Sequence, residues 1–137
     1  FGRFTNPLFL DPQNLRACSE ALDGVSIEHR DFSAVEKLAK KGDFVYFDPP
    51  YVPLSPTSDF TAYIPGGFGE AEQRKLADVF ARLARKGVHV MLSNSDTPLV
   101  RKLYDGFDIQ VVYASRSVNS KATGRGKLAE VVVRSYS

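Results

Sequence analysis

The chain carries, at residues 44–51, the run Phe44-Val45-Tyr46-Phe47-Asp48-Pro49-Pro50-Tyr51. Its first half is apolar and is bounded by Gly42 and by two prolines, which is typical of a short buried strand. Its second half then falls at the carboxyl end of that strand, where open α/β sheets bind their ligands. The run therefore predicts both an α/β sheet and the place of a site at its edge.

The residue types of Asp48-Pro49-Pro50-Tyr51 suit a site that holds a planar base with an amino group. The Asp48 carboxylate accepts hydrogen bonds only, so it can hold an –NH2 group. The two prolines have fixed φ angles and no N–H, which leaves rigid carbonyls, such as that of Pro49, as further acceptors. Tyr51 offers a face on which a base could stack, worth about 1–3 kcal/mol. The alternative is a turn after a strand, with Asp48 as a local cap and Tyr51 as packing.

The rest of the chain alternates between helical and strand patterns. Helices are expected over about 12–21, 34–41 and 70–86 and from Thr97-Pro98 onward, and strands over 25–28, 44–47, 88–92, 108–113 and 128–134. Ser33 and Glu36 have the spacing of a capping box at the start of the second helix, and Asn94 and Asp96 are expected to cap the fourth. The alternation predicts a mainly parallel, three-layer α/β sheet whose last two strands pair antiparallel.

Several stretches resemble one family of enzymes. Asp48-Pro49-Pro50-Tyr51 after an apolar strand resembles the catalytic motif of amino-methyltransferases that use S-adenosylmethionine. The remaining matches are similar to the Dam-type (D12 class) DNA adenine N6-methyltransferases, and they are Phe1-Gly2-Arg3-Phe4, Val52-Pro53-Leu54-Ser55, Asp59-Phe60-Thr61-Ala62-Tyr63, Leu92-Ser93-Asn94-Ser95-Asp96-Thr97 and Ser115-Arg116-Ser117-Val118. Together the matches cover essentially the whole chain.

The resemblance implies a Rossmann-like three-layer methyltransferase fold, of which this chain holds part. Residues 1–10 would end a DNA-recognition region, and residues 11–137 would form the C-terminal part of the catalytic domain. The implied reaction moves a methyl group from S-adenosylmethionine to N6 of an adenine flipped out of double-stranded DNA, as in DNA methylation by restriction-modification systems. The motif itself also occurs in enzymes that act on cytosine N4 or on RNA bases, and only the longer match over 52–63 favours DNA adenine.

The resemblance also implies roles for particular residues. Asp48, Pro49, Pro50 and Tyr51 would be catalytic, and Asp48 would also lie at the cofactor. Asp31 and Phe32 match a family position near the adenine of the cofactor, where Asp31 would accept from an amino group and Phe32 would stack. The alternative for this pair is a helix-capping Asp beside a core Phe.

A glycine-rich turn of the F-x-G-x-G type, which holds the cofactor in the resembled family, is not found among the ten glycines of the chain. Gly66-Gly67-Phe68-Gly69 follows a proline-containing loop, and Gly124-Arg125-Gly126 follows a polar loop, so both are interpreted as turns. We therefore expect the C-terminal half of a longer enzyme, inactive alone. The alternative is a non-enzymatic half-domain that binds DNA or a partner.

Basic residues gather between the last two predicted strands. From Ser115 to Lys127 the chain has no acidic residue and carries Arg116, Lys121, Arg125 and Lys127, with Asn119 among the polar residues between them. Contact with DNA phosphates is one interpretation, and a solvated hairpin is the other. Arg3 and Phe4 are further candidates for DNA contact.

The composition is that of a globular protein, with 137 residues, 43% hydrophobic and 25% charged, and a net charge of +2. The single Cys18 excludes an internal disulfide framework and fits a reducing compartment such as the cytoplasm. No apolar stretch approaches the length of a membrane span. His29 and His89 lack the spacing of metal ligands, so no metal is expected. Sheet edge left exposed in a half-domain could pair two copies of the chain.

Overall fold

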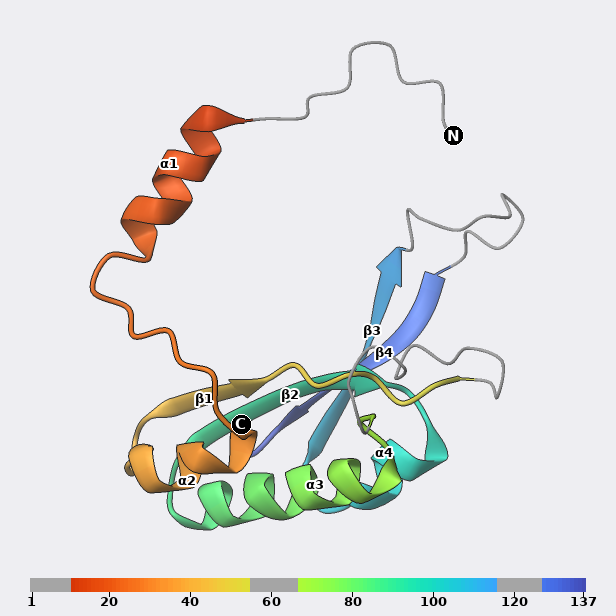
Figure 1. The fold of residues 1–137 in the computed structure, drawn as a ribbon. Coiled ribbons are helices and arrows are strands. Elements are labelled where there is room, and N and C mark those ends of the chain that lie inside the picture. The colour runs from red at the N-terminus through yellow and green to blue at the C-terminus, as the bar shows by residue number, and fades with distance from the viewer. Residues whose placement is uncertain (1–10, 55–66, 116–126) are drawn as a thin grey trace. The chain divides into compact units, whose positions relative to one another are not determined.

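The computed structural model describes residues 11–54, 67–115 and 127–137 (Figure 1). The chain divides into two compact units, Phe1–Arg30 and Asp31–Ser137. In the first unit α1 spans Pro12–Ala21 as predicted, and the Asp11 side chain caps it by accepting from the N–H of Asn14.

The strand predicted over residues 25–28 does not form. The segment has no regular secondary structure, and Ile27 is 81% exposed. A strand needs a neighbour to pair with its backbone N–H and C=O groups. The alternating pattern of these four residues was therefore a misleading signal.

The second unit is built on a sheet of four strands: β1 (Phe44–Phe47), β2 (His89–Ser95), β3 (Asp108–Ser115) and β4 (Lys127–Arg134). Their order is β1-β2-β4-β3. β1 and β2 pair parallel, whereas β4 runs antiparallel to both of its neighbours, β2 and β3. The predicted antiparallel pairing of the last two strands is confirmed. A parallel majority is not confirmed, because only one of the three pairings among the described strands is parallel.

The helices of this unit are η1 (Phe32–Ala34), α2 (Val35–Leu38), α3 (Glu70–Arg85) and α4 (Pro98–Leu103). Figure 1 shows α2, α3 and α4 on the same face of the sheet. The helix predicted over 34–41 is shorter than expected, because α2 spans only Val35–Leu38 and has no side-chain cap. The 3-10 helix η1 precedes it, and the cap of η1 is Asp31 rather than Ser33. Asp31 Oδ1 accepts from both the N–H and the hydroxyl of Ser33, so that hydroxyl is already engaged.

The core lies between α3 and the sheet. Leu76, Val79, Phe80 and Leu83 recur at helical spacing along α3 and are at most 1% exposed. They belong to one apolar cluster with Val90, Leu92, Val131 and Val133 of β2 and β4. Phe80 also makes edge-to-face contacts with Tyr104 and Phe107, which hold the end of α4 against α3. This packing fixes the position of α3 relative to the end of β2.

Candidate active site

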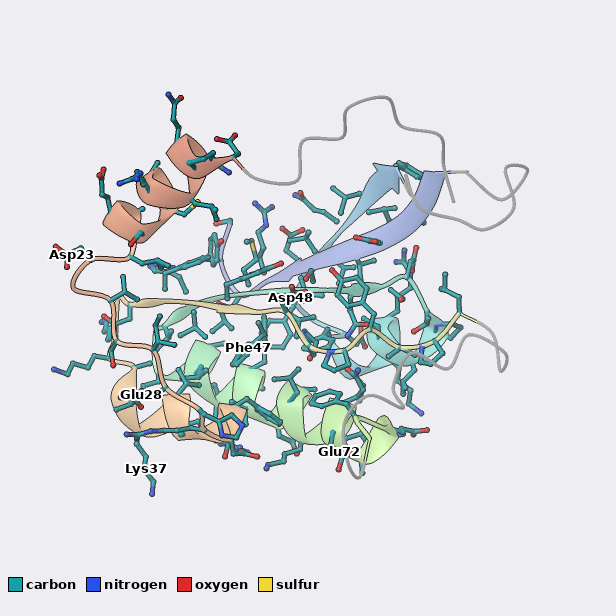
Figure 2. All side chains as sticks on the ribbon, turned by 45° about the horizontal axis from the view of Figure 1, so that its top comes forward. Asp23, Glu28, Lys37, Phe47, Asp48 and Glu72 are labelled. Carbon is teal, nitrogen blue, oxygen red and sulfur yellow. The ribbon has the colours of Figure 1, made fainter. Side chains whose placement is uncertain are left out.

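The predicted site residue Asp48 lies directly after the end of β1 (Figure 2). Phe47, the last residue of the strand, is buried in the core, whereas Asp48 is exposed. Side chains alternate along an extended chain, so Tyr46 and Asp48 project from the sheet face opposite to Phe47. Because β1 and β2 are parallel, their carboxyl ends meet at one edge, as predicted for the ligand site.

A chain of hydroxyl groups orients the Asp48 carboxylate. Ser93 Oγ of β2 donates to Asp48 Oδ1 at 2.9 Å, and the Tyr46 hydroxyl lies 2.8 Å from Ser93 Oγ. Since the Ser93 proton is given to Asp48, the Tyr46 hydroxyl is the donor to Ser93. One carboxylate oxygen is thus fixed, and the exposed carboxylate keeps further lone pairs for a donor on a ligand.

Tyr51, the aromatic residue of the motif, is half-buried beside this chain of hydroxyls. Burial raises the pKa of its phenol, the Ser93 hydroxyl opposes that shift, and the nearby Glu130, Asp48 and Tyr46 add to it. The phenol is therefore neutral at physiological pH. A neutral ring that is only partly covered can take part in stacking.

Two buried amides hold the backbone on either side of Tyr51. Gln73 Nε2 of α3 donates to the Pro50 carbonyl at 2.8 Å, and Asn94 Oδ1 of β2 accepts from the N–H of Val52 at 2.9 Å. The two amides are joined by Asn94 Nδ2, which donates to Gln73 Oε1 at 3.1 Å. The turn after β1 is thus tied to both neighbouring elements.

The expectation that Asn94 caps α4 is wrong. Thr97 Oγ1 accepts from the N–H of Val100 and is the cap of that helix. Asp96 instead pairs with Arg101, with Nε and Oδ1 2.6 Å apart. Gln73 was not singled out from the sequence, although a signal existed: it lies three residues before Leu76, on the apolar face of α3. An amide among apolar residues at helical spacing indicates a buried polar contact.

Residues 1–118 match the model of a family described as D12 class N6 adenine-specific DNA methyltransferase. The chain belongs to this family. The match confirms the family inferred from the sequence motifs.

This D12-class chain is also similar to curated proteins over nearly its whole length. It is 46% identical to a type II methyltransferase of Lactococcus lactis subsp. cremoris, over 99% of this chain and 49% of that protein. It is 40% identical to a type II methyltransferase of Methanocaldococcus jannaschii, over 99% of this chain and 48% of that protein. A DNA adenine methylase of Vibrio cholerae is 34% identical, over 96% of this chain and 48% of that protein. The chain spans about half the length of these relatives.

Asp31 and Phe32, which were predicted to lie at the adenine of the cofactor, both contact Lys75 of α3 in this D12-class chain. The Asp31 carboxylate accepts from Ser33 and from Lys75 Nζ, which lies 3.0 Å from Oδ2. Lys75 Nζ also lies 4.9 Å from the centre of the Phe32 ring, and that ring packs against Phe68 at 5.9 Å. The geometry favours the interpretation of Asp31 as a helix cap, because its carboxylate is already engaged by two residues.

Asp31 contributes to the stability of the folded chain in a way that depends on pH. The hydrogen bonds from Ser33, and then Lys75, lower the pKa of Asp31 from 3.8 to about 2. A pKa lowered in the folded state means that this stabilisation is complete above 3.8 and is lost as the pH falls toward 2.

We expect Asp31→Asn to weaken the acid dependence of stability, because the amide does not titrate. The midpoint of thermal unfolding should fall less steeply for the variant than for the wild type between pH 5 and pH 2. The pKa values of Glu36 and Asp96 are also lowered by their arginine partners, so both proteins should still lose stability in acid. Equal slopes for the two proteins would contradict the contribution of Asp31.

The predicted DNA contacts cannot be placed. Arg3, Phe4, Arg116, Asn119, Lys121 and Arg125 lie outside the described residues, as do residues 59–63. Of Lys127 only the backbone is described, as the first residue of β4. Within the described ranges, no three His, Cys, Asp or Glu side chains gather closely enough to hold a metal ion. None of the described helices is long and apolar enough to cross a membrane.

Proposed function

We propose that this chain carries the part of a DNA methyltransferase that holds the target amino group. The reaction transfers a methyl group from S-adenosylmethionine to N6 of adenine. The observation that carries the proposal is the arrangement of Asp48, which is exposed at the carboxyl edge of the sheet with one oxygen fixed by Ser93. Family membership supports adenine as the base.

The residues around Asp48 account for activation of the nitrogen. Asp48 and the Pro49 carbonyl accept the two protons of the N6 amino group, which pulls the nitrogen toward tetrahedral geometry and turns its lone pair outward. As the nitrogen attacks, positive charge develops on it, and the fixed Asp48 carboxylate stabilises that charge. The neutral ring of Tyr51 stacks on the base, which must first leave the duplex.

S-adenosylmethionine supplies the methyl group as part of a sulfonium ion when it is bound. Asp48 fits a place beside this cation, because its carboxylate is exposed and keeps free lone pairs. The Asp31 carboxylate fits less well, because Ser33 and Lys75 already engage it. Asp31 Oδ2 accepts only from Lys75 among the described residues, so a role for Asp31 and Phe32 at the adenine of the cofactor stays a part of the proposal to be tested.

DNA would bind through its phosphates to the basic segment between β3 and β4. The segment carries Arg116, Lys121, Arg125 and Lys127, with Asn119 beside them, and Arg3 and Phe4 would add contacts near the start of the chain. Each phosphate contact adds salt-sensitive affinity that carries no sequence information. This division of roles assigns binding to the basic segment and chemistry to the end of β1.

We also propose a Rossmann-like, three-layer fold for the catalytic domain, with residues 1–10 ending a DNA-recognition region and residues 11–137 in the catalytic part. In support, β1 pairs with β2 along one edge, and Phe44 and Tyr46 of β1 are exposed. Further strands could pair with the other edge of β1, and without them a second copy of this chain could pair there. The isolated chain is then expected to be inactive, and the single Cys18 fits a cytoplasmic enzyme.

The proposal is tested by identifying the product. The full-length protein is incubated with DNA and S-adenosylmethionine carrying a tritiated methyl group, and the DNA is digested to nucleosides. We expect the label in N6-methyladenine. Label in N4-methylcytosine would overturn adenine as the target. No transfer, together with salt-sensitive DNA binding, would favour a non-enzymatic binding module.

A further inference from the structure

Two buried amides behind the Asp48–Tyr51 turn have no role in the reaction as described so far. Gln73 of α3 is 2% exposed and Asn94 of β2 is 0% exposed. Gln73 lies on the buried face of α3 with Leu76 and Phe80, and Asn94 lies near the end of β2 between the buried Ser93 and Ser95. An unpaired amide in such a place costs roughly 1–3 kcal/mol, so its partners explain its presence.

The hydrogen bonds of the two amides form one network that ends on the backbone of the turn. Gln73 donates to the Pro50 carbonyl and accepts from Asn94. Asn94 Oδ1 accepts from the N–H of Val52 and, at 2.8 Å, from that of Ser95. The groups fixed by the network therefore lie immediately before and after Tyr51.

The turn needs side chains to hold it because its own backbone lacks donors. Pro49 and Pro50 have no N–H, so the chain cannot extend the sheet through them. Gln73 engages the Pro50 carbonyl from the side of α3. None of the described residues donates to the Pro49 carbonyl. Within the described part of the chain, the network thus engages the Pro50 carbonyl and not the Pro49 carbonyl.

Two residues at the end of β2 act on the two proposed acceptors of the amino group, which are the Asp48 carboxylate and the Pro49 carbonyl. Neighbouring side chains on a strand point to opposite faces. Ser93 points to the face of Asp48 and fixes the carboxylate, while Asn94 points to the face of α3 and fixes the turn. The separation between the two acceptors therefore depends on two consecutive residues of one strand.

We propose that Gln73 and Asn94 are positioning residues for methyl transfer. They act through the Pro50 carbonyl and the Val52 N–H, and they set the Pro49 carbonyl and the Tyr51 ring at the distance that the amino group and the base require. The inference rests on the proposed function, because it concerns the geometry of the same reaction. It assigns a kinetic effect to residues that touch neither the base nor the cofactor.

The first test is Gln73→Leu in the full-length protein. Leucine has a side chain of similar size but is apolar, so it removes both hydrogen bonds. We expect kcat per folded molecule to fall about 100-fold, since a displacement of about 1 Å in a reacting group has effects of that size. The KM for S-adenosylmethionine should change little. A folded variant with the kcat of the wild type would overturn the proposal.

The second test, Gln73→Glu, has a readout that a merely structural role would not change. A protonated glutamic acid has the shape of glutamine and can donate to the Pro50 carbonyl while accepting from Asn94. An ionised one repels that carbonyl, and burial raises its pKa. We expect kcat to fall as the pH rises through this titration, while circular dichroism shows that the protein stays folded. Asp48, Glu72 and Arg74 are present in both proteins, so the difference between the two profiles isolates residue 73. Identical profiles would overturn the proposal, even if Gln73→Leu did not fold.

A matched control on the same helix is Leu83→Ala, which is buried ten positions further along α3. It should lower the unfolding midpoint and leave kcat per folded molecule unchanged. If the wild type transferred no methyl group, the proposed function would fail. If the wild type were active, Asp48→Ala inactive and both Gln73 variants kinetically normal, only the role of the amide network would fail.

Discussion

Replacing Asp48 with alanine in the full-length protein is expected to abolish methyl transfer. In the proposed mechanism, the variant loses the carboxylate that holds the amino group and stabilises the charge developing on the nitrogen. Removal of a single oriented electrostatic group costs about 10²–10³ in kcat in other enzymes, and Asp48 combines that role with orientation. The measurement is transfer of labelled methyl groups to DNA at saturating concentrations of both substrates.

Asp48→Ala should leave the fold and the affinity for DNA largely intact. The side chain is exposed, and it accepts its hydrogen bond from Ser93 outside the core. Asp48→Asn is the informative companion, because it keeps the size and introduces a donor that faces the donor on the base. The control is Asp105→Ala, which replaces an exposed acid in the turn after α4. It makes the same change in charge and should leave methyl transfer unchanged. Methylation retained by Asp48→Ala would remove the basis for the proposed chemistry.

Replacing Phe80 with alanine is expected to have the largest effect on stability. Phe80 is fully buried, with ring centres 5.2 Å from Tyr104 and 4.9 Å from Phe107. Truncation of a buried Phe typically costs about 3–5 kcal/mol, and the loss of aromatic contacts adds to it. The total stability of a domain is about 5–15 kcal/mol. Denaturation in urea should therefore show a much lower midpoint with a similar slope.

Tyr104→Phe is the control for the same aromatic cluster. Among the described residues the Tyr104 hydroxyl is buried without a hydrogen-bond partner, and burial raises its pKa. Removing a hydroxyl whose desolvation is uncompensated should leave stability unchanged or raise it. If Phe80→Ala cost less than about 1 kcal/mol, the packing of α4 against α3 would differ from the one described.

The local signals of the sequence were reliable where one element determines its own structure. The apolar run of β1, the helical spacing of α3 and the proline at the start of α4 were predicted with bounds close to those observed. Prediction failed where a partner decides the outcome. Residues 25–28 have a strand pattern, but none of the described strands pairs with them. Asp31 rather than Ser33 provides the side-chain cap, and it caps the 3-10 helix η1 that precedes α2.

By itself, the sequence determined the place and the residue types of the candidate site, because Asp48, Pro49, Pro50 and Tyr51 are contiguous and follow a short apolar strand. Only the tertiary structure decided how they are held. Ser93 lies 45 residues from Asp48, Gln73 lies 23 residues from Pro50 and Asn94 lies 42 residues from Val52. These contacts depend on the parallel register of β1 and β2 and on the packing of α3 against the sheet. Both arise from interactions between residues that are far apart in the sequence. A pattern of neighbouring residues does not contain that information.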